Sequence, residues 1–381
     1  PVIAVDCACI VPMRLQPKQF ERAFEFHRHN QAELDERVRL PWHPVRPERP
    51  AFDGSIGFES LDLERIDIAA TCAACAIDHS VPPVPGSPGG STAGYHRWQS
   101  FLQHGLSGYA RDRNDAAKDW PCGVSRLSPY LHHGHVSPFR IAREAAAAGG
   151  EGSVKFLDEL LVWRELAFNF CFFTVDPESL SALPAWARAT LGEHAQDTRP
   201  RIIDSETLSR SGSGDEVWDL AQTSLRIHGE LHNNLRMTWA KAIPTWRPDP
   251  QAALDTLVAL NHRYALDGSD PNSYGGLLWS LGLFDRPFDE TPVMGRVRTR
   301  STAAHARRLD VDRYRARVSR PASGDALRIA GRFAARMMSI SAFSTSLSCR
   351  RRHRRPPTCW PVSLRGLPLR PRGLRMPRPG R

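Results

Sequence analysis

The 381-residue chain lacks the features that mark several large classes of protein. It has no apolar run of about 18 residues and no charged-then-apolar leader, so we expect neither a membrane span nor a secretory signal. A G-x-G-x-x-G turn and a G-x-x-x-x-G-K-S/T loop are both absent, which argues against a Rossmann dinucleotide site and a P-loop. No repeat with a period of roughly 20 to 50 residues is visible. The 8 Cys are scattered, which favours a soluble protein of a reducing compartment, and we predict the cytoplasm.

Charge is unevenly distributed along the chain. The net charge is +10, but residues 319–381 hold 15 Arg, no Lys and one acid, Asp325, whereas the preceding 318 residues carry a net −4. The basic balance therefore does not by itself indicate a nucleic-acid groove in the folded part. Residues 319–381 also hold 8 Pro and no apolar period, so we predict a disordered tail. It is interpreted either as a nucleic-acid arm or as an unselected extension.

Two clusters of His and Cys residues are candidate metal sites, but neither has the complete set of ligands that a metal site needs. Cys72 and Cys75, with His79 nearby, lack a second Cys or His pair, so buried thiols are the preferred interpretation. His132, His133 and His135 precede a Ser-Pro pair, which indicates the start of a helix. We predict no metal site.

The chain from residue 94 onward shows mostly helical patterning. The run Lys155–Phe173 is apolar on nearly every side and is predicted to be a central helix of a large core. Residues Val2–Val11 form a β-branched apolar stretch that predicts one buried strand, and a strand needs partners. Either the chain pairs it elsewhere, or an α/β domain preceded Pro1 and is missing, since the chain does not begin with Met. Further helices are predicted at Lys18–Arg39, Val217–His228, Leu231–Ile243, Pro250–Tyr264 and Tyr274–Leu281.

Tryptophan placement is unusual for core helices. Trp163, Trp218, Trp239, Trp246 and Trp279 fall within these predicted helices beside charged or amide residues. Each one alone is explained by packing, although a buried indole needs a partner for its N–H. Together they suggest redox chemistry or base stacking.

Four ordered blocks resemble one protein family. They are SRLSPYLHHGHVSP (Ser125–Pro138), ELLVWRELAFNFCFF (Glu159–Phe173), LRMTWAKAIPTW (Leu235–Trp246) and LNHRYALDGSDPNSYGGLLWSLG (Leu260–Gly282). In this order they resemble the photolyase/cryptochrome family, most closely the class II cyclobutane pyrimidine dimer photolyases, over about Pro1–Tyr314. The resemblance implies a mainly α fold: an all-helical domain that binds FAD, preceded by an α/β antenna domain. Here only a remnant of the antenna domain is expected, with a disordered tail at the other end. The expected division is 1–93 for the antenna remnant and linker, 94–318 for the FAD domain and 319–381 for the tail.

The resemblance also implies roles for individual residues. Around FAD, Arg236 and Asp267 match an ion pair against the flavin ring, and Asn261 matches the residue beside flavin N5. At the lesion, Glu159 matches a residue that hydrogen-bonds the pyrimidine carbonyl, while Trp163 and Trp279 match side chains that sandwich the flipped bases. The FAD phosphates and ribityl chain are expected against the Gly90–Gly94 turn and Tyr109, Leu127, Ser128, Tyr130 and Leu131, and DNA against Arg113 and Asn114.

Electron supply to the flavin is where the sequence departs most from the family. Trp218, Trp239 and Trp246 match the class II electron chain, but Pro244 stands where the family has an ordinary helical residue. Proline bends a helix, so we expect a lengthened path from Trp239 to Trp246. His133 in place of Phe and Thr238 in place of Tyr are milder departures.

The resemblance implies light-driven repair of cyclobutane pyrimidine dimers by an electron from excited reduced FAD, with damaged DNA as partner and a monomeric enzyme. A cryptochrome-like or repair-inactive flavoprotein is the closest alternative. A truncated chain that does not fold is a third possibility, suggested by the missing antenna domain and the unmatched tail.

Overall fold

Helices make up nearly all the regular structure in the part of the chain that the computed structural model describes, residues 5–41, 54, 57–59, 62 and 64–321. In this part the only β pairing is an isolated bridge between Thr291 and Gly295. The mainly α fold expected from the sequence is therefore confirmed. Residues 322–381, most of the predicted tail, lie outside the described residues, and so do residues 1–4.

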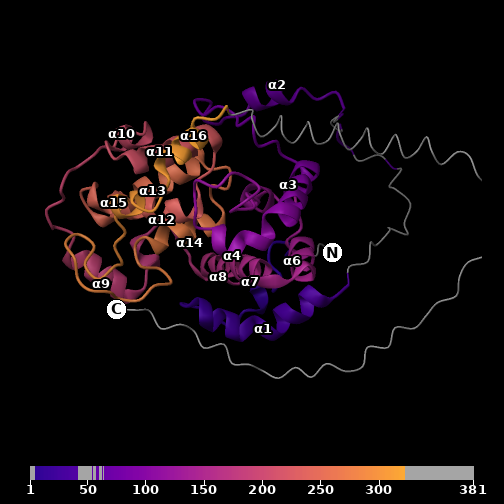
Figure 1. Ribbon diagram of the computed structural model, residues 1–381, viewed down its shortest axis with the longest axis horizontal. Coiled ribbons are helices and arrows are strands. Elements are labelled where there is room, and N and C mark those ends of the chain that lie inside the picture. The colour runs from indigo at the N-terminus through magenta and orange to yellow at the C-terminus, as the bar shows by residue number, and fades with distance from the viewer. Residues whose placement is uncertain (1–4, 42–53, 55–56, 60–61, 63, 322–381) are drawn as a thin grey trace, which may run out of the picture. The chain divides into compact units, whose positions relative to one another are not determined.

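The elements follow one another as short and medium helices (Figure 1). The first half contains η1 (Met13–Leu15), α1 (Ala23–Arg39), α2 (Ile68–Ala73), α3 (Ser91–His104), η2 (Leu106–Gly108), α4 (Tyr109–Asp112), α5 (Ser128–His132), α6 (Pro138–Ala148), α7 (Gly150–Leu157), η3 (Asp158–Trp163) and α8 (Arg164–Phe173). The second half contains η4 (Leu180–Ala182), α9 (Ala185–Glu193), α10 (Ser205–Ser209), α11 (Glu216–His228), α12 (Asn233–Ala242), η5 (Ile243–Thr245), α13 (Pro250–Tyr264), α14 (Pro271–Trp279), α15 (Thr302–Ala306) and α16 (Val311–Val318).

Several helices begin at a capping residue followed by proline. Asp249 caps α13 and Asp270 caps α14, and each accepts a hydrogen bond from a backbone N–H of the first turn before a Pro at the first helical position. Ser137 caps α6 in the same way, as the Ser-Pro pair predicted. Proline suits this position because its missing N–H would have no partner there. These signals explain why the predicted bounds of Pro250–Tyr264 coincide with α13.

The long apolar run Lys155–Phe173 is continuous but not one regular α-helix. It comprises the end of α7, the π-helical segment η3 and α8. A π-turn is a wider helical turn with i→i+5 hydrogen bonds, and it is frequent at functional sites. Here the π-turn spans Asp158–Trp163 and so carries Glu159 and Trp163.

The predicted strand at Val2–Val11 is wrong for its described part. Residues 5–11 form no strand. Instead, the backbone N–H groups of Ile10 and Val11 donate to the carboxylate of Glu165 on α8, at 2.6 and 3.3 Å. A side-chain acceptor therefore does what a neighbouring strand would do, because buried backbone donors need partners from some source.

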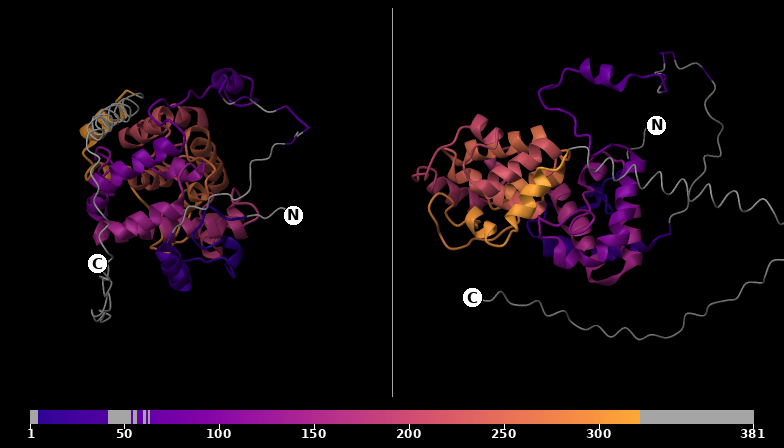
Figure 2. Two further views of the ribbon diagram at one scale, coloured as in Figure 1. Left: turned by 90° about the vertical axis from the view of Figure 1, so that its right-hand side faces the viewer. Right: turned by 45° about the horizontal axis from the view of Figure 1, so that its top comes forward.

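Two main apolar clusters hold the helices together. One contains Trp98, Phe101 and Phe156 of α3 and α7, and the larger one contains Trp218 and Trp239 of α11 and α12. Figure 2 shows the earlier helices, in purple and magenta, beside the later ones, in orange. All described residues belong to one compact unit, Pro1–Arg332. The expected division after residue 93 falls inside α3, and Arg320, placed in the predicted tail, still pairs with Glu230 at 2.6 Å.

No helix among the described residues is both long and apolar enough to cross a membrane.

Candidate cofactor and substrate pocket

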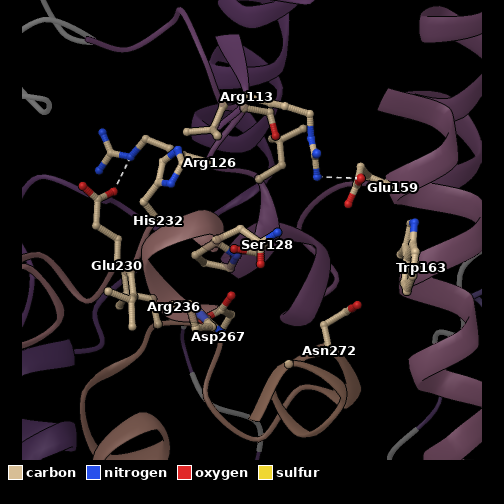
Figure 3. A pocket seen from close by; sticks show the side chains of 18 of the residues that line it. Arg113, Arg126, Ser128, Glu159, Trp163, Glu230, His232, Arg236, Asp267 and Asn272 are labelled. Atoms are coloured by element: carbon tan, nitrogen blue, oxygen red, sulfur yellow. Dashed lines mark hydrogen bonds and ion pairs between the residues drawn. The ribbon is translucent and has the colours of Figure 1, made fainter. Parts of the chain in front are cut away.

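A cavity of about 570 Å³ opens between the two groups of helices. Its wall is formed by α4, by the loop that leads into α5, by the continuous helix α7–η3–α8, and by segments of α12, α14 and α16. Figure 3 shows its side chains converging from these elements. The predicted site residues that line it are Tyr109, Arg113, Leu127, Ser128, Tyr130, Glu159, Trp163, Arg236, Asp267 and Trp279.

One side of the pocket is an ion cluster centred on Glu159. Its carboxylate lies 2.6 Å from Arg113 Nη2 and 2.8 Å from Lys155 Nζ. Burial would lower the pKa of Arg113, but the charges and hydrogen bonds of Glu159 and Tyr109 together outweigh burial and raise that pKa. Trp163 is on the same helical wall as Glu159 (Figure 3) and is 38% exposed. Arg113, expected at the rim of a DNA site, therefore belongs to the pocket wall, and Lys155 is a site residue that the sequence did not reveal.

Trp279 lines another side of the pocket, and the amino group of the buried Lys241 packs against its ring. Lys241 Nζ lies 4.4 Å from the centre of the Trp279 ring and donates to the backbone carbonyl of Ser280 at 3.1 Å. Burial lowers the pKa of Lys241 to about 7. The cation fixes both the indole and the C-terminal end of α14.

Arg236 and Asp267 form a buried ion pair at the bottom of the pocket. Arg236 Nη2 lies 3.4 Å from Asp267 Oδ1, and the two side chains are only 9% and 11% exposed. Behind this pair, Asn261 Nδ2 donates to Ser273 Oγ at 3.0 Å. Asn261 is fully buried and its Oδ1 has no hydrogen-bond partner among the described residues.

The loop before α5 enters the pocket with a strained residue. Arg126 has φ 55°, a left-handed conformation that costs a non-glycine residue about 1–2 kcal/mol. Its guanidinium pairs with Glu230 (Figure 3). Leu127 and Ser128 follow on the pocket wall, and the Tyr130 hydroxyl donates to the Pro88 carbonyl at 2.8 Å.

Glu230 joins three arginines from distant segments, and sequence reasoning missed this cluster. Arg126, Arg317 and Arg320 surround its carboxylate. Burial opposes ionisation of Glu230, but the three guanidinium groups outweigh it and lower its pKa to about 2. The cluster attaches α16 to the pocket, and Tyr314 and Arg317 of α16 line the wall. The run DVDRYRARV, whose three Arg include Arg317, was the only sequence signal for this contact.

Three of the predicted tryptophans form a contiguous column next to the pocket helix α12. Trp218 and Trp239 stack with ring centres 6.0 Å apart and an interplanar angle of 9°, and Trp218 meets Trp246 edge-on at 5.4 Å. Trp218 thus lies between the other two. Pro244 falls in η5, after α12 has ended at Ala242, so a path through Trp218 does not cross the bend. The expected lengthening of the direct path from Trp239 to Trp246 stays a prediction.

Several predicted residues lie off the pocket wall. Asn114 is exposed, and its backbone carbonyl accepts from Asn234 Nδ2 at 2.7 Å. Leu131 packs in the core beside the pocket, and Asn261 lies behind it. Gly90 and Gly94 open α3, where a Cβ at Gly94 would come within 2.8 Å of the Tyr130 ring.

The Cys72–Cys75 interpretation needs correction. Both thiols are exposed, not buried, because the short helix α2 that carries Cys72 has no buried residue. In the described part of the chain no group of three or more His, Cys, Asp or Glu side chains could hold a metal ion.

Fold and site together define a helical protein with a deep pocket that joins a basic wall to two tryptophans. The chain is 37% identical over 285 residues to a protein of Oryza sativa subsp. japonica named deoxyribodipyrimidine photo-lyase, a match that covers 74% of this chain and 54% of the relative. It is 32% identical over 314 residues to the Arabidopsis thaliana protein of that name, covering 81% and 63%. On this similarity the chain belongs to the photolyase/cryptochrome family.

The chain spans about half to two thirds of the length of these curated relatives. No family model matches it. Among solved structures, a bacterial class III photolyase from Agrobacterium tumefaciens is similar with a TM-score of 0.48 and 19% identity, over 67% of this chain and 56% of that one. The closer match to class II stays a prediction.

Proposed function

We propose that the protein binds FAD in this pocket and uses light to split cyclobutane pyrimidine dimers in DNA. The observation that carries the proposal is that one cavity joins the residues expected to hold FAD, such as Ser128, Arg236 and Asp267, to those expected to hold the lesion, Glu159, Trp163 and Trp279. These residues come from segments more than a hundred positions apart. Their convergence supports a cofactor and a substrate that meet in one place.

The wall suits an anionic dinucleotide. A cavity of about 570 Å³ is within the usual range for cofactor sites. Its lining has twice as many basic as acidic side chains, which suits a diphosphate: Arg97, Arg113, Arg126, Lys155, Arg236 and Arg317 against Glu159, Glu230 and Asp267. We therefore infer that FAD fits.

Bound FAD would supply a light-excitable electron donor. Arg236 and Asp267 would orient its ring, and the Arg236 charge would favour negative charge there. Arg126, Leu127 and Ser128 would hold the phosphate portion, and Tyr109 and Tyr130 the neighbouring wall. A role for Asn261 beside flavin N5 stays a prediction from the sequence, because this residue lies behind the pocket wall.

At the lesion end, the ion cluster changes the role expected for Glu159. A carboxylate paired with two cations accepts hydrogen bonds and cannot donate them. We propose that Glu159 accepts from a pyrimidine N–H, while Arg113 and Lys155 donate to the carbonyl oxygens. Charge that appears on a carbonyl only when the dimer takes up an electron would then meet donors already in place. The dimer bonds break in that state and the electron returns, so no net oxidation occurs.

Trp163 and Trp279 would stack on the flipped bases, and damaged bases are the least costly to flip. The tryptophan column would deliver electrons from the surface in the order Trp246, Trp218, Trp239. Damaged DNA is therefore the proposed partner. A role for Asn114, a monomeric state and a cytoplasmic location stay predictions from the sequence.

The test is a repair assay on the full chain. We expect the purified protein to bind FAD noncovalently, with a flavin absorption spectrum, and to restore a thymine-dimer oligonucleotide under blue light but not in the dark. A folded protein that ignores added FAD would refute the proposal. A protein that binds FAD but repairs nothing in the chemically reduced state would instead be a repair-inactive flavoprotein.

A further inference from the structure

A buried imidazole on the pocket wall has one ring nitrogen engaged and the other without a partner. His232 is 9% exposed and lines the pocket together with Arg126 and Arg317. Its Nδ1 accepts from the backbone N–H of Asn234 at 3.3 Å, which makes it the N-cap of α12. Its Nε2 has no hydrogen-bond partner among the residues that the structure describes.

The protonation of this ring follows from its surroundings. Because Nδ1 accepts a hydrogen bond, the neutral ring carries its proton on Nε2. Burial, aided by the nearby Arg317, lowers the pKa of His232 to about 3, so the ring stays neutral at ordinary pH. A residue of the pocket wall therefore holds a buried N–H donor, and a buried donor without an acceptor destabilises the free protein.

The neighbours of this donor indicate what it would bind. Figure 3 places His232 between Arg126 and Ser128, and Arg317 lies on the same wall. Guanidinium, hydroxyl and N–H donors gathered at one place are the set that recognises phosphate oxygens. A cap for α12 needs only Nδ1, so capping does not account for Nε2.

We propose that His232 is a further binding residue of the pocket, whose Nε2–H donates to a diphosphate oxygen of the ligand. The inference rests on the proposed function, because it takes FAD as that ligand. If so, His232 lowers the stability of the protein without FAD and raises the affinity of the protein for FAD.

The variant His232→Asn tests the roles of the two ring nitrogens separately. Asparagine keeps an oxygen that can cap α12 and removes the Nε2–H. We expect the dissociation constants of FAD and of ADP to rise by about 10- to 100-fold, as for a lost hydrogen bond to a charged group. Riboflavin, which has no phosphate, should bind as before, and the melting temperature of the FAD-free protein should not fall.

His228→Asn is the matched control. His228 is also a buried imidazole, 2% exposed, but its Nε2 donates to the Val318 carbonyl at 2.8 Å and it is not on the pocket wall. This variant should show the opposite pattern, with a lower melting temperature and unchanged affinity for FAD and ADP.

Unchanged affinity of His232→Asn for FAD and ADP would overturn the inference, and so would a loss for riboflavin as large as that for ADP. If the variant does not fold, histidine-labelled wild-type protein carries the test by NMR: the Nε2 proton should move downfield when ADP is added, and no movement would refute the proposal. Failure of the wild type to bind FAD would count against the proposed function, whereas the ADP measurements test His232 separately.

Discussion

Lys241 places a titratable ammonium under Trp279, and we predict that it makes the protein more stable as the pH rises above neutrality. The side chain is 2% exposed, and its ammonium donates to the carbonyls of Trp279 and Ser280. Burial is the main cause of its lowered pKa; Asp285 opposes the effect and Arg298 adds to it. The ordinary value of 10.5 falls to about 7.

The direction follows from proton counting. Between pH 7 and 10.5, approximately, the unfolded chain keeps the Lys241 proton while the folded chain has lost it, so raising the pH favours folding. The difference between the two pKa values corresponds to at most about 5 kcal/mol. Of this, about 2.5 kcal/mol falls between roughly pH 7.5 and 9.5.

Urea unfolding of the wild type, Lys241→Met and Lys155→Met at several pH values in this window tests the reasoning. Lys155 is the control, because its contacts with Asp158 and Glu159 outweigh burial and raise its pKa, so its contribution is lost only above the window. We expect Lys241→Met to lose the rise of about 2.5 kcal/mol and Lys155→Met to keep it. If the free energy of unfolding of Lys241→Met rises with pH as much as that of the wild type, burial does not lower the pKa of Lys241.

Three further predictions concern the proposed chemistry. Glu159→Ala should lower the quantum yield of repair by up to about tenfold and lesion affinity by less, because its contacts matter most in the charged state; equal losses on a thymine-dimer oligonucleotide would mean that Glu159 only binds. Trp218→Phe should abolish photoreduction of oxidised FAD with an external reductant, while chemically reduced protein still repairs. In the Pro244→Lys variant, oxidised FAD should be photoreduced at the wild-type rate, since the path runs through Trp218. A faster rate in this variant would contradict that path, because it would mean that electrons pass directly between Trp246 and Trp239.

Local signals in the sequence predicted local structure well. Asp249 and Pro250 predict where α13 begins, and Ser137 and Pro138 predict where α6 begins. The four family blocks predicted most of the pocket wall, because residues such as Ser128 and Arg236 belong to motifs whose spacing is fixed within a single segment.

Contacts between distant segments were not predictable in the same way. The strand expected near the N-terminus depended on apolar pattern alone, whereas Glu165, 155 positions from Ile10, supplies the acceptor. The pairing of Arg126 and Arg317 with Glu230 likewise depends on how α16 and the loops before α5 and α12 pack. The pattern of apolar and polar residues does not identify these donor–acceptor pairs. A buried backbone or guanidinium donor needs an acceptor, but any acceptor that the fold brings close can serve.

Several places where this chain breaks local rules border its pocket. Arg126 and Phe284, which both line the wall, adopt the positive φ values that non-glycine residues avoid. His232 buries a donor without an acceptor, and Lys241 buries a charge under Trp279. In contrast, the fully buried indoles of the tryptophan column are satisfied: Trp218 donates to the Trp239 carbonyl and Trp239 to Gln222, both at 3.0 Å. Folding alone would remove strained or unpaired groups wherever they lie. An unpaired donor on the pocket wall, such as His232 Nε2–H, is therefore what is expected where the missing partner is a ligand.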